Sequence, residues 1–203
     1  MSQLPMFPLG SVLFPHMPLM LRVFEERYIV MLSRVLQQRP SEFGVVLIER
    51  GQEVGGGEKR FSTGTVARIV ELETAEGFIG LLAEGVTRIE VTDWLVDDPH
   101  PAADVRALPE LEWDDDLLVE LVAVEELVRA AIVLEAGVGE PRWPADIELS
   151  DEPVARAWQL AGIAPLGPLD QVALLRSATL AELIGLTAEL TAAASEQWME
   201  PDS

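Results

Sequence analysis

Apolar residues in the first half of the chain occur in short runs that are broken by glycine and proline, a pattern typical of strands. Glu76-Gly77 and Glu84-Gly85 supply turn chemistry between the later runs. The segment 25–37 instead has apolar residues three or four positions apart, which predicts a helix. The predicted strands are residues 19–24, 43–48, 65–70, 78–82, 87–91 and 105–108. They indicate a small, strongly coiled sheet or partly open barrel.

After Pro109 the chain changes to long stretches rich in Ala, Leu and Glu, which predict a bundle of about four helices. The first stretch follows Asp114-Asp-Asp116, acids suited to the positive end of a helix. Thr179 with Glu182 three positions later is a capping-box pattern for the last helix. The sequence therefore predicts an α+β fold: a small β-rich pseudo-barrel with one helix over residues 1–110, and a C-terminal helical bundle over residues 111–203.

Charge and cysteine content narrow the class of protein. The chain has 35 acidic and 14 basic residues and a net charge of −21. Residues 1–110 hold 16 acids and 10 bases, whereas residues 111–203 hold 19 and 4. Such a surface repels phosphate backbones and anionic lipid, so we expect neither nucleic acid nor membrane as a partner. The absence of cysteine fits a reducing cytoplasm, where we expect the protein, and excludes disulfides, thiolate zinc sites and thiol catalysis.

No motif of catalysis or phosphate binding is complete. Residues 51–58 have the glycine spacing of a phosphate-binding loop, but Gly57-Glu58 stands where Lys-Ser/Thr is required, so a surface hairpin loop is the better interpretation. The sole lysine, Lys59, lies in that same glycine-rich region, and His16 and His100 both neighbour prolines in apparent turns. We expect no catalytic residue, no metal site and no cofactor.

Three apolar side chains are candidates for contact with a partner. Met17 and Met20 belong to a group of methionines near the N-terminus, and flexible methionine surfaces suit the binding of varied partners. Trp143 stands between Arg142 and Pro144 in a connector, where an exposed indole would be a contact residue. The competing interpretation is burial: in the core for the methionines, and between the two parts of the chain for Trp143.

The order of several segments resembles the N-terminal substrate-binding domain of Lon proteases. The similarity runs from about Leu4 to about Leu190. It is carried by Leu4-Pro-Met-Phe-Pro-Leu-Gly-Ser-Val-Leu-Phe-Pro15, Gly64-Thr-Val-Ala-Arg-Ile69, Leu82-Ala-Glu-Gly-Val-Thr-Arg-Ile89, and Trp158-Gln-Leu-Ala161 with Pro165-Leu166 and Gln171-Val-Ala-Leu-Leu175. The fold implied by this resemblance, a β-rich pseudo-barrel followed by a helical bundle, agrees with the division by composition.

The resemblance implies that the chain recognises polypeptide: unfolded segments, degradation tags or a partner protein. Full-length Lon proteases continue into an ATPase module and a Ser-Lys peptidase domain, and the chain ends at Ser203 with neither. We therefore expect binding without catalysis, in which an open sheet edge or an apolar groove accepts an extended peptide. Two alternatives stay open: a small-molecule sensor or adaptor that uses the seam between barrel and bundle, and a free-standing hydrolase.

Overall fold

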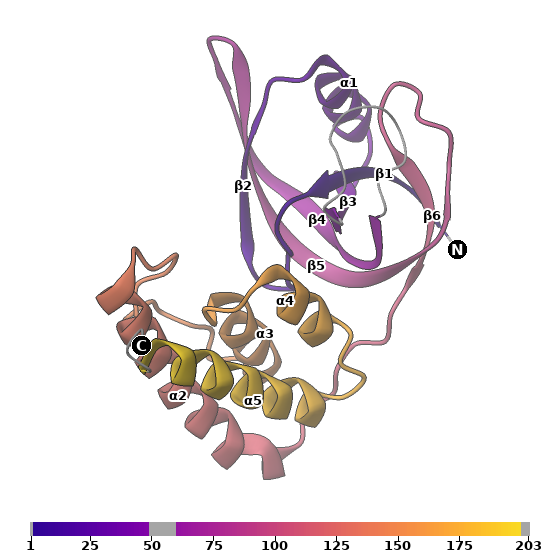
Figure 1. Ribbon diagram of the computed structural model, residues 1–203. Coiled ribbons are helices and arrows are strands. Elements are labelled where there is room, and N and C mark those ends of the chain that lie inside the picture. Colours follow the sequence, from indigo (N-terminus) through magenta and orange to yellow (C-terminus); the bar gives the residue numbers. More distant parts are fainter. Residues whose placement is uncertain (1, 49–59, 200–203) are drawn as a thin grey trace. The chain divides into compact units, whose positions relative to one another are not determined.

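The computed structural model describes residues 2–48 and 60–199, in two compact units that comprise residues 1–110 and 111–203. The first unit contains all six described strands and helix α1, and the second contains helices α2 to α5 (Figure 1). This arrangement confirms the predicted α+β class. The loop predicted over residues 51–58 lies outside the described residues, and so does Lys59.

The six strands form one mixed sheet in the order β2-β5-β4-β3-β1-β6, and β5 also pairs with β6 (Figure 1). Strands β5, β4, β3, β1 and β6 thereby close into a coiled ring, and β2 is attached to it through β5. The pair β1–β3 is parallel, and the other described pairs are antiparallel. The strands are β1 Ser2–Leu9, β2 Pro18–Val23, β3 Glu42–Ile48, β4 Arg60–Ala75, β5 Phe78–Trp94 and β6 Ala102–Ala107.

Strand β5 is continuous, so the predicted turn at Glu84-Gly85 is wrong. The amide of Gly85 donates to the Met17 carbonyl at 2.9 Å, and its own carbonyl accepts from the His16 amide at 2.8 Å. A Cβ at position 85 would lie 2.1 Å from the backbone oxygen of Phe14. This glycine therefore serves a close approach of two backbones inside a strand, which is the other common use of glycine in sheets.

Strand β1 was not expected from the sequence, because it contains Pro5 and Pro8, and proline removes a donor from a sheet. Its first half pairs with β6, with Pro5 opposite Ala102. Its second half pairs with β3, with Pro8 opposite Val46. The strand changes partner midway, and this makes the N-terminal residues one of the strands of the ring.

Helix α1 (Glu26–Val35) packs its apolar face against the sheet as its spacing predicts. The Tyr28 ring stacks on that of Phe7 with centroids 3.9 Å apart, and Phe7 in turn contacts Phe43 of β3. The buried face of the helix comprises Tyr28, Met31, Leu32 and Val35. A further cluster in the same unit contains Met6, Val46, Val66, Ile89, Val91, Ala103 and Val105.

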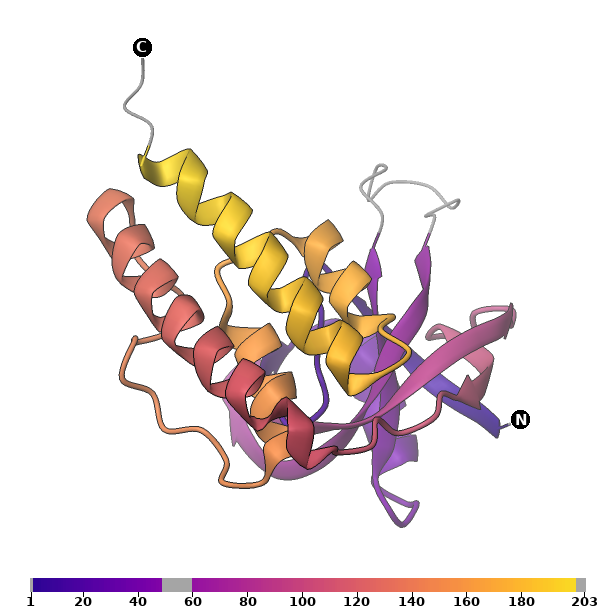
Figure 2. The same cartoon turned by 90° about the horizontal axis from the view of Figure 1, so that it is seen from below.

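The second unit is helical. A short 3₁₀ turn (Asp115–Leu117) leads into α2, and Figure 2 shows α2 and α5 lying side by side. The helices are α2 Leu118–Val138, α3 Pro153–Ile163, α4 Pro168–Leu175 and α5 Leu180–Met199. Their facing sides are apolar and include Val124, Val128, Ile132, Trp158, Leu174 and Leu183.

Hydrogen bonds confirm the predicted capping box of α5, and the acids before α2 cap the 3₁₀ turn that precedes that helix. The Asp114 carboxylate accepts from the Asp116 amide at 3.1 Å. The Thr179 hydroxyl accepts from the Glu182 amide at 3.1 Å, and the Glu182 carboxylate accepts from the Ala178 amide at 2.7 Å. These contacts satisfy amides that have no partner within the helix.

Glu125 ties α2 to α3 and to the connector before α3. Its carboxylate is 13% exposed and binds both Arg129 and Arg156. Arg129 also donates to the carbonyls of Ala145 and Ile147, and so fixes the connector along α2. A carboxylate this shielded is stabilised only when it is paired and hydrogen-bonded, as it is here.

Candidate functional site

Strand β2 is an edge of the sheet. It runs antiparallel to β5, from Pro18 opposite Glu84 to Val23 opposite Ile79. No other described strand pairs with it, and Figure 1 shows it at the outer margin of the strands. An edge strand presents unpaired N–H and C=O groups, which form a template for another extended chain.

The outward backbone groups of β2 can be assigned from its register. Because the Met17 carbonyl accepts from the Gly85 amide, hydrogen-bonded pairs recur at every second residue along the two strands. Leu19, Leu21 and Val23 therefore turn their backbone groups towards β5. Met20 and Arg22 turn theirs away, so the free edge carries two amides and two carbonyls from these residues.

The side chains beside this edge are partly apolar and exposed. Met20 is 80% exposed, and Phe24, directly after the strand, is 69% exposed. On the same sheet face, Met20 stands opposite Leu82, and Arg22 stands opposite Gly80. An extended chain laid along β2 would thus meet an apolar side chain and a basic one, two positions apart.

The guanidinium of Arg22 lies over the Phe78 ring, 5.2 Å from its centroid. This cation–π contact holds the side chain against the sheet face. No carboxylate or carbonyl of the described residues accepts a hydrogen bond from it.

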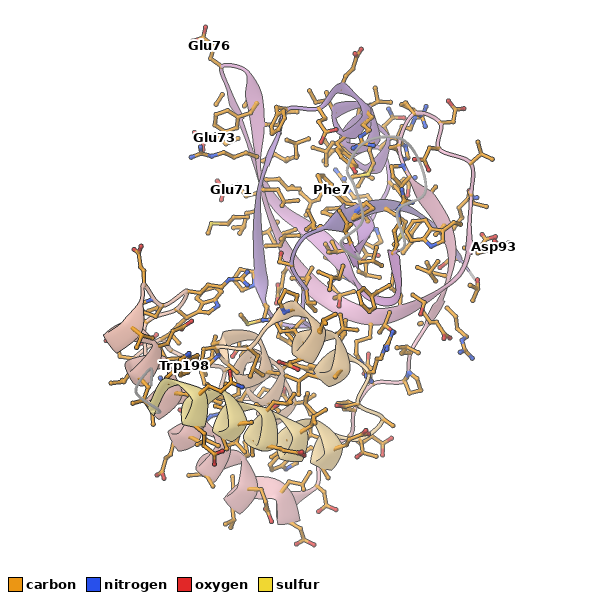
Figure 3. The ribbon with its side chains drawn as sticks, viewed as in Figure 1. Phe7, Glu71, Glu73, Glu76, Asp93 and Trp198 are labelled. Carbon is orange, nitrogen blue, oxygen red and sulfur yellow. The ribbon has the colours of Figure 1, made fainter. Side chains whose placement is uncertain are left out.

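A second free edge lies at the far end of β4, where residues 71–75 pair only with β5 among the described strands. This edge begins with an irregular register between Ile69 and Glu71. Glu71 and Glu73 are exposed on it, and Glu76 follows at the turn (Figure 3). Bulges and charged side chains are the usual means by which proteins protect an edge from further pairing.

The three residues predicted to contact a partner fall in different environments. Met20 lies on the β2 edge. Met17 is 6% exposed and packs in the interior of the first unit. Trp143 is half-buried in the connector of the second unit, and its indole N–H is buried with no acceptor among the described residues. The sequence reasoning missed Arg22 and Phe24, although both lie in the run 19–24 that predicted the strand.

Arg88 and His100, two further buried polar residues, have structural partners. Arg88 donates to the Pro109 carbonyl at 2.7 Å, and burial lowers the pKa of its guanidinium. Arg34 approaches His100 Nε2 at 3.2 Å; because a guanidinium only donates, Nε2 accepts, and Nδ1 donates to the Pro101 carbonyl. In residues 2–48 and 60–199 no group of three His, Cys, Asp or Glu side chains is placed to hold a metal ion.

No helix in the described part of the chain combines the length and apolar character needed to cross a membrane.

Comparisons with known proteins agree on one family. Residues 3–192 match the model of the ATP-dependent protease La (LON) substrate-binding domain. Lon protease of Anaeromyxobacter dehalogenans is 31% identical over 136 residues, and Lon protease 2 of Hydrogenovibrio crunogenus is 34% identical over 65 residues. These segments cover 64% and 32% of the chain but only 16% and 7% of the two relatives, so the chain spans a small part of their length.

Solved structures give the same result. The Lon N-terminal domain protein from Xanthomonas campestris superposes with a TM-score of 0.65 at 26% identity, covering 93% of this chain and 98% of that one. The N-terminal domain of Mycobacterium avium complex Lon protease has the same fold, with a TM-score of 0.66 at 16% identity over 94% and 98% of the two chains. The chain therefore belongs to the LON substrate-binding domain family.

Proposed function

We propose that the chain binds extended polypeptide segments by strand addition to the free edge of β2. The observation that carries this proposal is the outward-facing backbone of Met20 and Arg22 on a strand that has one described neighbour. An added strand gains main-chain hydrogen bonds, which do not depend on sequence, and contacts with Met20 and Phe24 give shallow apolar selection. Membership in a substrate-binding domain family supports a protein ligand.

The β2 edge suits this role better than the end of β4. The β4 edge carries Glu71 and Glu73 and an irregular register, and both features oppose pairing. The β2 edge is regular over its six residues and carries a single charged side chain, that of Arg22. Unfolded segments and an extended tail of a partner protein offer the same backbone chemistry, so both belong to this ligand class.

The test is fluorescence anisotropy of a labelled, permanently unfolded polypeptide titrated with the protein, with a folded protein as the control ligand. Met20→Pro removes one outward amide and the exposed side chain but no hydrogen bond to β5. We expect saturable micromolar binding of the unfolded chain, and a loss of about tenfold or more in Met20→Pro.

The matched control is Thr74→Pro. By the same alternation, Thr74 turns its backbone outward on the β4 edge, so this variant removes an equivalent amide at the other edge. Thermal unfolding of both variants checks that they remain folded. The proposal fails if the wild type does not bind at several hundred micromolar, or if Thr74→Pro loses binding while Met20→Pro keeps it.

A further inference from the structure

We infer that Arg22 recognises a carboxylate on the segment that β2 accepts. This inference rests on the proposed strand addition and adds a chemical preference to it. The segment would be extended and would carry an apolar residue two positions from the carboxylate, to match Met20 and Arg22.

The first argument is that Arg22 has no acceptor among residues 2–48 and 60–199, although the chain is rich in acids. Every other arginine described in residues 1–110 has a carboxylate, a carbonyl or a hydroxyl within reach. The pairs are Arg27 with Glu25, Arg34 with Asp98, Arg39 with Leu36 and Ser41, Arg60 with Asp97, Arg68 with Glu42, Arg88 with Pro109, and Arg106 with Glu90.

The second argument is the geometry of Arg22. The guanidinium lies over the Phe78 ring, 5.2 Å from its centroid, and a cation–π contact uses none of its N–H groups as a donor to an oxygen. The contact with Phe78 restricts the rotation of the side chain, so an ion pair costs less entropy here than on a freely moving arginine. The fork of N–H groups matches the two oxygens of a carboxylate.

The third argument is position. Arg22 turns its backbone outward, so it would form a hydrogen-bonded pair with the residue opposite it on an added antiparallel strand. Directly opposed side chains have Cβ atoms about 5 Å apart, and opposite charges at that spacing attract. Gly80, opposite Arg22 on β5, has no side chain, so the next side chain in this row is that of Glu73 on β4, which forms no ion pair with Arg22.

The rival explanation is that Arg22 only protects the edge from unwanted pairing, as charged residues on edge strands often do. That role predicts no preference between a ligand with a carboxylate and the same ligand with an amide. Recognition predicts a preference that disappears with the guanidinium.

The experiment compares three labelled eight-residue peptides of valine and threonine. The first has a central glutamate and an amidated C-terminus, the second a central glutamine and an amidated C-terminus, and the third a central glutamine and a free C-terminal carboxylate. Titrations are run at about 150 mM salt, where the Debye length of about 8 Å screens the distant acids of the protein. The proteins are the wild type, Arg22→Gln and Arg142→Gln.

Arg142→Gln is the matched control, because it changes the net charge equally at an exposed arginine of the second unit. We expect a carboxylate peptide to bind the wild type and Arg142→Gln about three- to tenfold more tightly than the amidated glutamine peptide. Arg22→Gln should bind all three equally. A gain with the glutamate peptide assigns a side-chain carboxylate, and a gain with the third peptide assigns the chain end.

Equal binding of all three peptides by the wild type overturns the carboxylate inference and leaves strand addition standing. The same loss of preference in Arg142→Gln also overturns it, because the effect would then reflect net charge alone. Absence of binding for every peptide overturns the proposed function together with the inference.

Discussion

At the scale of single residues, Gly85 has the least space for a side chain among the glycines of β5. A Cβ there would lie 2.1 Å from the Phe14 carbonyl oxygen, which is backbone and cannot rotate away. A Cβ at Gly80, five residues earlier in the same strand, would lie 3.6 Å from its nearest neighbour, the backbone oxygen of Glu73. Alanine variants at the two positions therefore distinguish the cost of a close backbone contact from the general effect of replacing glycine by alanine in a strand.

We expect Gly85→Ala to lower the free energy of unfolding by about 2 kcal/mol or more, because the Phe14 segment must shift to admit the methyl group. Gly80→Ala should change it by less than about 0.5 kcal/mol. Urea denaturation followed by tryptophan fluorescence measures both. Equal stability of the two variants would contradict the close approach at Gly85.

A comparison of Gly85 with Gly77 shows what the local sequence can and cannot predict. Glu76-Gly77 and Glu84-Gly85 are identical dipeptides, and both predict turns. Gly77 is a turn residue with φ of +87°, whereas Gly85 lies inside a strand. The difference comes from the Phe14 segment, which is distant in sequence but crosses at Gly85. No local pattern contains that information.

At the scale of elements, α2 is apolar on nearly all sides. Its buried face includes Val124 and Val128, but Val119, Val122 and Val133 on the opposite side are exposed. The sequence spacing identified the buried face correctly, because Leu121, Val124, Val128 and Ala131 follow the helical period.

This contrast gives a paired prediction within one helix. Val128→Ala should destabilise the protein by about 2–3 kcal/mol, since it removes buried methyl groups and leaves a cavity. Val133→Ala removes the same atoms from a side chain that is 61% exposed, and should change stability by less than about 0.5 kcal/mol. Chemical denaturation of the two variants measures the difference, and similar losses would show that the outer face is also buried in solution.

For strand β2 of the candidate site, too, the local sequence predicts the strand but not its neighbours. The run 19–24 predicts β2 to within one residue at each end, and it contains Met20, whose contact with a partner stays a prediction. That β2 is an edge depends on which strands lie beside it. This order is set by pairings such as β2–β5 and β1–β6, which join segments distant in the sequence. The roles proposed for Arg22 and Phe24 depend on this edge, so they could not be proposed from the sequence alone.

At the scale of the whole molecule, repulsion among like charges outweighs attraction. The chain has 35 acids and 14 bases, and several of the bases are already paired with carboxylates. Added salt screens distant repulsions over a Debye length that falls from about 20 Å to about 7 Å between dilute and moderate salt. Close, shielded pairs such as Glu125 with Arg129 are weakened less.

We therefore expect the midpoint of thermal unfolding to rise by about 2–5 °C when sodium chloride is raised from about 20 mM to about 200 mM at neutral pH. Differential scanning fluorimetry measures the shift, and potassium chloride at equal ionic strength controls for specific ion binding. A fall in the midpoint would mean that surface ion pairs contribute more than the excess of acids.

The closure of the strand ring has a consequence for biosynthesis. Residues 2–5 of β1 pair with residues 102–105 of β6, so the two ends of the ring are about a hundred positions apart in the chain. A ribosome adds about 5–20 residues per second, so the N-terminal strand must wait roughly 5–20 s for this partner to be synthesised. During that interval the apolar segment that contains Met6 and Phe7 cannot be fully enclosed, and nascent chains are most exposed to chaperones and to wrong pairing at this stage.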